Sequence, residues 1–520
     1  MSTRRRLLAA TGGMAVITLV GRVAGLVRDK TVAVLLGAGM VSDAFYTAFR
    51  IPNMFRQLLA EGALHAAFIP TLTELRAEGD ERRTRAFVSA MTSLLLLALP
   101  LIVVAGIVAA PWLVDLFAAR FAATPGKLEL TVWLTRLMFP YLGLISLAAL
   151  AQGVLNASGR FLLPASTPIA LGLCIAGGTV AAVLVFGGRP EWMAIGALVG
   201  GFLQFAMQWV GCVRVGLPLL PGRGAFSDPL VRRVLSLMAP TVTTLGIYPL
   251  TILLSTRFAA SVGEGAVTCI YNASRANELV YGVVIVQLTT AVLPMLAAER
   301  LASEQAARGT LGFAVRLLSA VALPSTVFAA VLATPVIGVL FGGGKYTPGA
   351  VETAGAALVM YALGMPFLGL SKLLASASFA WKDTRSPVIA SVVNLAVFFV
   401  LGVTLTGPFG VGGVAAATSG GQVANAAVLL WLDGKHRRLP SARDVLPAVA
   451  RHAVAAGTLG VAVFFAQRAF PVPLATSVRS ITQLVAVALL GGLVYLGALV
   501  ALRAPELREA KDLLLRRRAA

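Results

Sequence analysis

The chain has 520 residues, of which 58% are hydrophobic and only 12% are charged. Soluble domains carry ~25% charged residues, so this composition excludes an ordinary soluble globular protein. One or two soluble cores could not hide so much apolar surface, and most of it must therefore face lipid. The net charge of +21 would suggest nucleic acid in a soluble protein. In a membrane protein the positions of the charges matter more than their sum.

Long apolar stretches recur along the whole chain. About 20 apolar residues in a helix cross the hydrocarbon core, so each such stretch predicts a membrane-spanning helix. The sequence predicts fourteen of them, and the expected fold class is therefore an all-α polytopic membrane protein. Their approximate ranges are 7–35, 42–74, 86–117, 130–156, 161–187, 191–213, 230–258, 266–297, 310–341, 352–380, 386–407, 410–432, 446–469 and 478–502.

The first stretch follows Arg4, Arg5 and Arg6 and so resembles a secretory signal. It also contains Arg22 and Arg28 and lacks a convincing small-residue cleavage site, so we expect it to be retained as a helix. The number of helices is then even, which places both termini on the same side of the membrane.

Most Lys and Arg residues outside the predicted helices lie on the side that carries the two termini. The densest basic segments on that side are residues 76–85, 435–451 and 503–518. Because positively charged loops stay in the cytoplasm, we expect both termini to be cytoplasmic.

The chain repeats itself at an offset of 223 to 226 residues. For example, the segment YTAFR at 46–50 recurs as YNASR at 271–275, and PYLGL at 140–144 recurs as PFLGL at 366–370. This repeat predicts two six-helix lobes related by a pseudo-twofold axis along the membrane normal, with a substrate path between them. The predicted domains are an N-terminal lobe at 1–220, a C-terminal lobe at 221–437, two additional helices at 438–502 and a basic cytoplasmic tail at 503–520.

Several charged side chains lie inside the predicted helices. An arginine at the centre of a lipid-facing helix costs roughly 3 kcal/mol, so these residues are expected to face an aqueous cavity or a partner. Four arginines fall in the first two helices, namely Arg22, Arg28, Arg50 and Arg56. At 100° per residue, one polar stripe on the second helix contains Asp43, Tyr46, Arg50, Asn53, Gln57 and Glu61. A matching stripe on the eighth helix contains Thr268, Tyr271, Asn272, Arg275 and Glu278.

Two interpretations of these arginines stay open at this point. They can be structural, paired with acidic residues such as Asp29, Asp43, Glu61 or Glu278 to hold helices together. Alternatively, they can line a shared cavity that receives an anionic substrate, because the planar guanidinium fork donates two hydrogen bonds to phosphate. Three residues close to helix ends, Arg136, Arg257 and Lys372, are expected to extend toward the membrane interface.

Four short stretches in the N-terminal region carry a family resemblance. GRVAGLVRD at 21–29, GAGMVSDAF at 37–45, RIPNMFR at 50–56 and AEGA at 60–63 closely resemble the lipid II flippases of peptidoglycan synthesis, the MurJ (MviN) family. That family belongs to the superfamily of multidrug, oligosaccharidyl-lipid and polysaccharide exporters. Gly172 departs from it, since asparagine is frequent there.

The resemblance implies that the chain flips lipid II, the lipid-linked peptidoglycan precursor, from the cytoplasmic to the periplasmic leaflet by alternating access. It places the cavity arginines of the family at Arg22, Arg28, Arg56 and Arg275, the outer-gate aspartate at Asp43 and the acid of the second helix at Glu61. The predicted substrate-binding residues are Arg22, Arg28, Arg50, Asn53, Arg56, Arg275 and Glu278. The predicted gating residues are Asp29, Asp43 and Glu61.

The same resemblance implies a multi-pass protein of the bacterial cytoplasmic membrane, with lipid II and membrane lipids as partners and the two additional helices as a groove for the lipid tail. We expect a monomer, with the cell-wall synthesis machinery as a candidate protein partner and no nucleic acid. The three cysteines, Cys174, Cys212 and Cys269, form no paired motif, so no metal site or cofactor is predicted.

Two other functions remain as alternatives. One is an exporter of another polyprenyl-diphosphate-linked oligosaccharide of the same superfamily. The other is a membrane-embedded glycosyltransferase, which would need a catalytic carboxylate at an aqueous face, with Asp115, Glu129 and Glu352 as the outer candidates. No catalytic motif stands in a suitable context, so we predict a transporter and not an enzyme.

Overall fold

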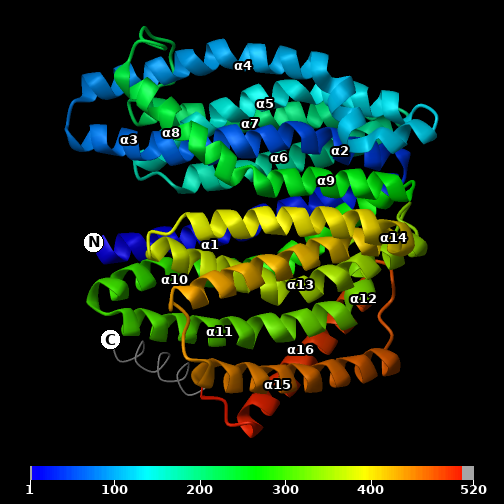
Figure 1. Cartoon of the computed structure of the whole chain (residues 1–520). Helices are drawn as coiled ribbons and strands as arrows, with labels where there is room; N and C mark the ends of the chain where they lie inside the picture. The colour runs from blue at the N-terminus through cyan, green and yellow to red at the C-terminus, as the bar shows by residue number, and fades with distance from the viewer. Residues whose placement is uncertain (1–2, 506–520) are drawn as a thin grey trace. The chain divides into compact units, whose positions relative to one another are not determined.

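A computed structural model describes residues 3–505 of the chain (Figure 1). The chain divides into two compact units, Met1–Thr268 and Cys269–Ala520, which are described in turn. Within residues 3–505, the structure does not describe the side chains of residues 3–15, 59–61, 239–245, 248, 283–291, 294 and 302.

The first unit consists of helices joined by short turns. Its helices are α1 (Thr3–Leu36), α2 (Met40–Phe55), the π-helix η1 (Arg56–Leu64), α3 (His65–Ala77), α4 (Glu81–Ala118), the 3-10 helix η2 (Ala119–Ala123), α5 (Lys127–Ala157), α6 (Leu162–Val180), the π-helix η3 (Ala181–Val185), α7 (Glu191–Arg214), α8 (Pro229–Leu245) and α9 (Ile247–Val262). The helix α10 (Ala266–Ala302) begins at the end of this unit and continues into the second.

The second unit is also helical. Its further helices are α11 (Glu304–Val331), α12 (Ala333–Phe341), α13 (Pro348–Ala380), α14 (Arg385–Lys435), α15 (Ala442–Ala469) and α16 (Val478–Ala501). Residues 3–505 contain no β-strand, and each predicted membrane-spanning stretch falls on these helices, so the all-α class is confirmed.

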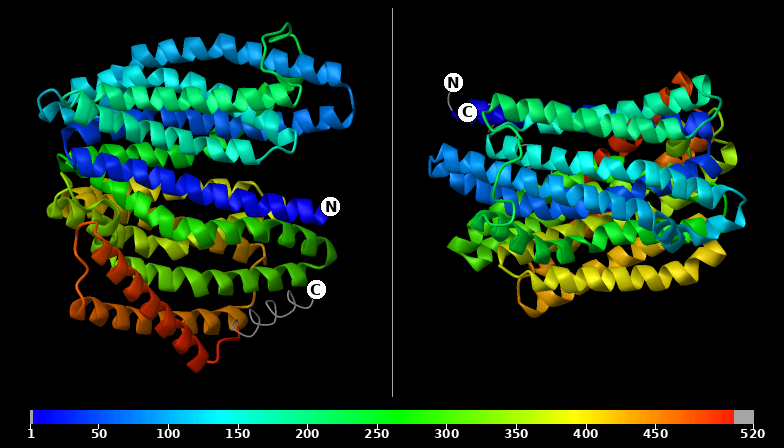
Figure 2. Two further views of the ribbon diagram at one scale, coloured as in Figure 1. Left: turned by 180° about the vertical axis from the view of Figure 1, so that it is seen from behind. Right: turned by 90° about the horizontal axis from the view of Figure 1, so that it is seen from above.

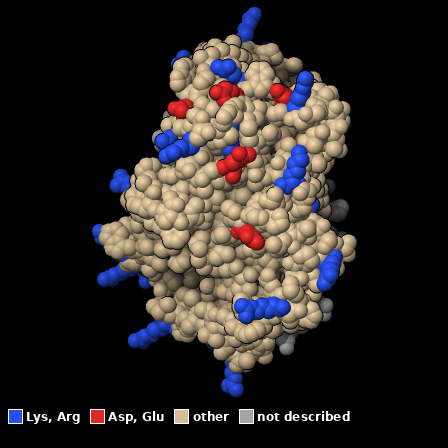
Figure 3. Space-filling view, turned by 90° about the vertical axis from the view of Figure 1, so that its right-hand side faces the viewer, with Lys and Arg blue, Asp and Glu red and all other residues tan. Residues whose placement is uncertain are grey.

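Nine helices in the described part of the chain are long and apolar enough to cross a membrane. Large apolar side chains cover their outer surfaces, as on α4, where Leu101 is 73% and Trp112 is 70% exposed. In Figure 3 the charged side chains stand singly or in small groups on a surface made of other residues. Such a surface suits contact with the hydrocarbon core of a membrane. The predicted number of fourteen membrane-spanning helices stays a prediction.

The long helix α14 contains two of the predicted membrane-spanning stretches. Its backbone leaves the helical conformation at Gly410, with φ 54° and ψ −132°. A Cβ on Gly413 would lie 2.1 Å from the carbonyl oxygen of Leu405, and one on Gly421 would lie 2.2 Å from Asn394 Oδ1. A straight helix would separate residues 394 and 421 by about 40 Å, so α14 is an antiparallel hairpin that turns at Gly410. Figure 1 shows it in yellow.

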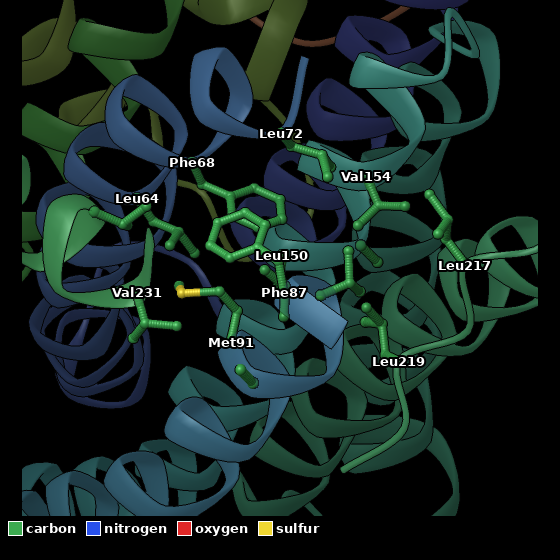
Figure 4. Packing of buried hydrophobic residues seen from close by; sticks show 14 of the residues in the cluster. Leu64, Phe68, Leu72, Phe87, Met91, Leu150, Val154, Leu217, Leu219 and Val231 are labelled. Carbon is green, nitrogen blue, oxygen red and sulfur yellow. The ribbon is translucent and has the colours of Figure 1, made fainter. Parts of the chain in front are cut away.

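A buried apolar cluster holds α3, α4, α5 and the start of α8 together in the first unit (Figure 4). The rings of Phe68 and Phe87 stack with their centroids 5.5 Å apart, and Leu150, Leu217 and Val231 belong to the same cluster. The helix α5 also packs against α2 and α7, so it supports the segment that carries the predicted polar stripe.

The second predicted helix is not one continuous α-helix. Pro52 has no backbone N–H to donate, and three residues after it, at Phe55, α2 gives way to the π-helix η1. A π-helix closes its hydrogen bonds over one more residue per turn than an α-helix. The polar stripe was predicted with a rotation of 100° per residue, which does not apply beyond Phe55. The predicted angular positions of Arg56, Gln57 and Glu61 on the helix are therefore wrong.

In the second unit, α13 packs against α11, α12 and α14. The helix α15 packs along α11, and α16 crosses α15 obliquely in both views (Figures 1 and 2). These last two helices correspond to the two additional helices predicted at 438–502, whereas the predicted lobe boundaries stay predictions.

A cluster of charges ties the α13–α14 loop to the segment that precedes α15. Arg438 donates from Nη1 to Asp383 Oδ2 at 2.8 Å and to Asp433 Oδ1 at 3.3 Å. Burial opposes ionisation of Asp383, but hydrogen bonds from the Ser386 hydroxyl, from Arg438 and from two backbone amides outweigh it and lower the pKa of this carboxyl. A lowered pKa means that the cluster stabilises the fold when Asp383 is ionised.

We expect Arg438→Gln to lower the stability of the detergent-solubilised protein at pH 7 by about 1–3 kcal/mol, because two carboxylates lose a charged donor. The difference in stability between the wild type and the variant should be fully present above the ordinary carboxyl pKa of 3.8. It should shrink as the pH falls from there toward the lowered pKa of Asp383. Thermal unfolding at several pH values measures it, with exposed Arg443→Gln as the control. A difference that grows on acidification would contradict this assignment.

Close contact between α6 and α7 depends on a glycine. A Cβ on Gly178 would lie 2.4 Å from the carbonyl oxygen of Trp192, whereas one on the adjacent Gly177 would meet nothing within 4 Å. Gly178→Ala should therefore force the helices apart and cost about 1–3 kcal/mol, and Gly177→Ala should not. Melting temperatures of the two purified variants check this, and equal values would show that the contact is not limiting.

Candidate functional site

Asp43 is held by four hydrogen bonds. It is fully buried near the start of α2. Its carboxylate accepts hydrogen bonds from Lys127 Nζ at 2.8 Å, from the backbone amides of Gly265 at 2.7 Å and Thr268 at 2.9 Å, and from Thr268 Oγ1 at 2.7 Å. The Gly265 amide directly precedes α10 and the Thr268 amide lies in its first turn, where backbone N–H groups lack helical partners and favour a negative charge. Asp43 thus joins α2 to α5 and to the start of α10.

Lys127 supplies the positive charge that this arrangement needs. Only 1% of it is exposed, and its ammonium also lies 4.2 Å from the centroid of the Phe121 ring. Two charges buried this deeply are tolerated because they are paired and hydrogen-bonded. Removal of either one would leave its partner buried without a counter-charge.

Gly265 allows the loop before α10 to approach Asp43. Its φ is +80°, and a Cβ there would lie 2.7 Å from the carbonyl oxygen of Ala38. A side chain at this position would therefore strain the backbone and collide with the turn before α2. The close approach places the Gly265 amide within reach of Asp43.

The polar stripe continues along α2 with contacts inside the first unit. Arg50 donates from Nη1 to the hydroxyl of Thr256 on α9 at 2.5 Å. Arg56, at the start of η1, donates from Nε to Asn53 Oδ1 at 2.8 Å. The structure therefore brings Asn53 and Arg56 together, as two half-buried members of the predicted binding set. The side chain of the predicted gating residue Glu61 lies outside the described residues.

On α1, Arg28 forms an ion pair with its neighbour Asp29. Both Nε and Nη2 of Arg28 lie 2.8 Å from Asp29 Oδ1, and both side chains are buried. Arg22 lies half-buried on the same helix, which packs against α6. Gly172 on α6 sits against α1, since a Cβ there would be 3.0 Å from the carbonyl oxygen of Ala24. That contact explains a small residue at this position.

In the second unit, Arg275 and Glu278 form an ion pair on α10. Arg275 Nη1 lies 2.7 Å from Glu278 Oε2, and each side chain is 38% exposed. Arg275 also donates from Nε to the hydroxyl of Tyr271 at 3.1 Å and lies over that ring. Unlike Arg28 and Asp43, this pair stays accessible.

Two lysines that are not among the predicted site residues lie close to the residues described above, Lys127 next to Asp43 and Lys372 next to Tyr281 on α10. Lys127 lies between the predicted membrane-spanning stretches 86–117 and 130–156, but in the structure it is the first residue of α5 and contacts Asp43. Lys372 was expected to extend to the membrane interface, but its ammonium lies 5.9 Å from the centroid of the Tyr281 ring on α10. A usable signal for Lys127 was its position at the start of a predicted helix, on the same membrane side as Asp43.

Comparisons with known proteins give a consistent result. The sequence profile of the family described as "Lipid II flippase MurJ" matches residues 32–483. The lipid II flippase MurJ of Burkholderia cenocepacia is 35% identical over 392 residues, which are 75% of each chain. The probable lipid II flippase MurJ of Rhizobium meliloti is 33% identical over 497 residues, covering 92% of this chain and 91% of the relative.

A solved structure shares the fold. It is described as "Lipid II flippase MurJ, inward closed conformation" and aligns with a TM-score of 0.80 at 23% identity. The alignment covers 94% of this chain and 98% of the solved one. The helical architecture therefore extends over nearly the whole chain.

The Asp43–Lys127 pair predicts a specific pattern of stability. Lys127→Met should lower the free energy of unfolding by about 3–5 kcal/mol, because it leaves a buried carboxylate without its counter-charge. The double variant with Asp43→Asn should recover part of that loss. Thermal unfolding in detergent measures both, and Lys345→Met, in an exposed turn, is the matched control. Equal melting temperatures for Lys127→Met and the control would refute the pairing.

Proposed function

Because the chain belongs to the lipid II flippase MurJ family, we propose that it moves lipid II from the cytoplasmic to the periplasmic leaflet by alternating access. It is a multi-pass protein of the inner membrane, and the proposal makes it a transporter and not an enzyme. The diphosphate and sugars enter a polar cavity, while the polyprenyl tail stays in lipid against α15 and α16.

The observation that carries the proposal is a set of arginines, in both units, within stretches that the sequence predicts to span the membrane. Arg22, Arg28, Arg50 and Arg56 belong to the first unit and Arg275 to the second. A guanidinium donates two parallel hydrogen bonds to phosphate oxygens, so several of them suit a diphosphate better than a neutral headgroup. Arg275 is an accessible first contact, because 38% of its side chain is exposed, compared with 10% for Arg28.

Each of these arginines also has partners within the protein, which sets a condition on binding. A substrate phosphate has to compete with Glu278 for Arg275 and with Asp29 for Arg28. Such an exchange keeps the arginine paired but releases the carboxylate, which costs little for Glu278 because its side chain is 38% exposed and more for Asp29 because its side chain is 3% exposed. We therefore propose that the carboxylates hold the arginines in place until the diphosphate replaces them.

Asp43 fits the proposed gating role for a different reason. Its four hydrogen bonds join α2 to α5, to the loop before α10 and to the first turn of α10. Movement of α10 away from α2 would have to break three of them, those from Gly265 and Thr268. We propose that this carboxylate closes the outer side of the transport path. The proposal also places both termini in the cytoplasm and takes the protein to be a monomer.

Direct measurement of lipid transport tests the proposed function. Proteoliposomes that contain the purified protein should expose labelled lipid II on the opposite leaflet faster than protein-free vesicles do. A parallel assay with another polyprenyl-diphosphate oligosaccharide separates the alternative exporter. In cells, depletion should make lipid II accumulate on the cytoplasmic leaflet, and normal periplasmic exposure without the protein would defeat the proposal.

A charge exchange distinguishes binding by Arg275 from a purely structural ion pair. Arg275→Ala should abolish growth of cells that depend on this protein, although the variant still inserts. The double variant Arg275→Glu with Glu278→Arg restores the pair but moves the cation by three residues, and it should still fail. Growth is the measurement, with membrane levels as the control. Full growth of the exchanged variant would assign Arg275 to helix packing alone.

A further inference from the structure

Lys372 is a charged residue within a membrane-spanning helix that the proposed function does not use. It lies on α13 (Pro348–Ala380), eight residues before the end of this helix, which is about 12 Å along its axis. Its neighbours Ser371 and Leu373 are buried, whereas Lys372 itself is exposed. A cation at this depth is costly in lipid and is expected to serve a partner or a substrate.

The surroundings of Lys372 are formed by one face of α10. Tyr271, Arg275, Glu278 and Tyr281 follow one another at intervals of four, three and three residues, which places them on the same side of the helix. Lys372 Nζ lies 5.9 Å from the centroid of the Tyr281 ring and interacts electrostatically with Glu278. Tyr281 also packs with apolar residues of α11 and α13, so its position next to α13 is fixed by the core.

Charge and chemistry of this face favour an anionic ligand. Arg275 and Lys372 contribute two positive charges, and Glu278, which is already bound to Arg275 at 2.7 Å, contributes one negative charge. A surplus of one positive charge therefore remains on this face. The two side chains differ in kind, since arginine donates through a planar fork and lysine acts as a compact point charge that rotates its three donors.

We propose that Lys372 is a substrate-binding residue that contacts the diphosphate of the lipid-linked substrate together with Arg275. This inference rests on the proposed function and deepens it, because it assigns a second phosphate-binding cation to the second unit. Arg275 holds one phosphate in a fixed geometry, and the flexible lysine follows the other phosphate from α13.

Binding measurements on the full-length protein in nanodiscs test the inference with two probes, purified lipid II and undecaprenyl diphosphate without sugars. Lys372→Gln should weaken binding of both by about tenfold, the effect of one lost charged hydrogen bond. Lys372→Arg should keep most of the affinity. The matched control is Lys435→Gln, since Lys435 lies 5.9 Å from the Trp431 ring but at the end of α14.

A double-mutant cycle separates binding from a structural role. If Lys372 only neutralises Glu278, its replacement should have no effect in a Glu278→Gln background. If Lys372 contacts the diphosphate, the loss of affinity should persist in that background, and the melting temperature of Lys372→Gln should match the wild type. Persistence supports the inference, and disappearance of the effect overturns it.

The two probes also separate this inference from the proposed function. If the wild type binds lipid II and Lys372→Gln binds it equally well, the role of Lys372 is refuted and the proposed lipid II flippase function is unaffected. Binding of undecaprenyl diphosphate but not of lipid II, lost in Lys372→Gln, would support the role of Lys372 and refute lipid II as the substrate. Loss of lipid II binding alone would assign Lys372 to the sugars or peptide and overturn the diphosphate contact.

Discussion

A charge inside an apolar helix bundle must have a counter-charge or a hydrogen-bond partner, and this constraint organises the molecule. The Asp43–Lys127 pair meets it with both residues almost completely buried. Arg28 meets it with its neighbour Asp29, and Arg275 meets it with Glu278 at a partly exposed position. Each pair fixes the position of a cationic or acidic side chain before any substrate arrives, because separation would leave a charge in a low-dielectric medium.

The structural and the substrate-binding interpretations of the arginines are therefore compatible. A cation that is held by a neighbouring carboxylate is already oriented, so a substrate anion finds its donors in place. Exposure separates the two pairs: the accessible pair on α10 can exchange with a ligand directly, whereas the buried pair on α1 has to open before Arg28 can reach one. The half-buried Arg50 and Arg56, with hydroxyl and amide partners, lie between these two extremes.

Much of the fold could be predicted from the sequence, because runs of apolar residues long enough to cross a membrane have few alternatives to a helix. The polar residues of α2 up to Asn53 could be placed on one face, because their spacing matches the period of an α-helix. The π-helix at Arg56–Leu64 could not, since the apolar pattern does not reveal which hydrogen-bond register the backbone adopts. The partners of Asp43 and Glu278 depend on contacts between helices distant in the chain, so Lys127 and Lys372 were assigned to loops and interfaces.

The turn at Gly410 has a consequence for how the polypeptide reaches the lipid phase. Only one residue leaves the helical conformation between the two arms of α14, so no soluble stretch separates them. During biogenesis the first arm has no hydrophilic segment behind it that could be exported on its own. We expect the two arms to partition into the bilayer as one unit, which satisfies the backbone of both at the same time.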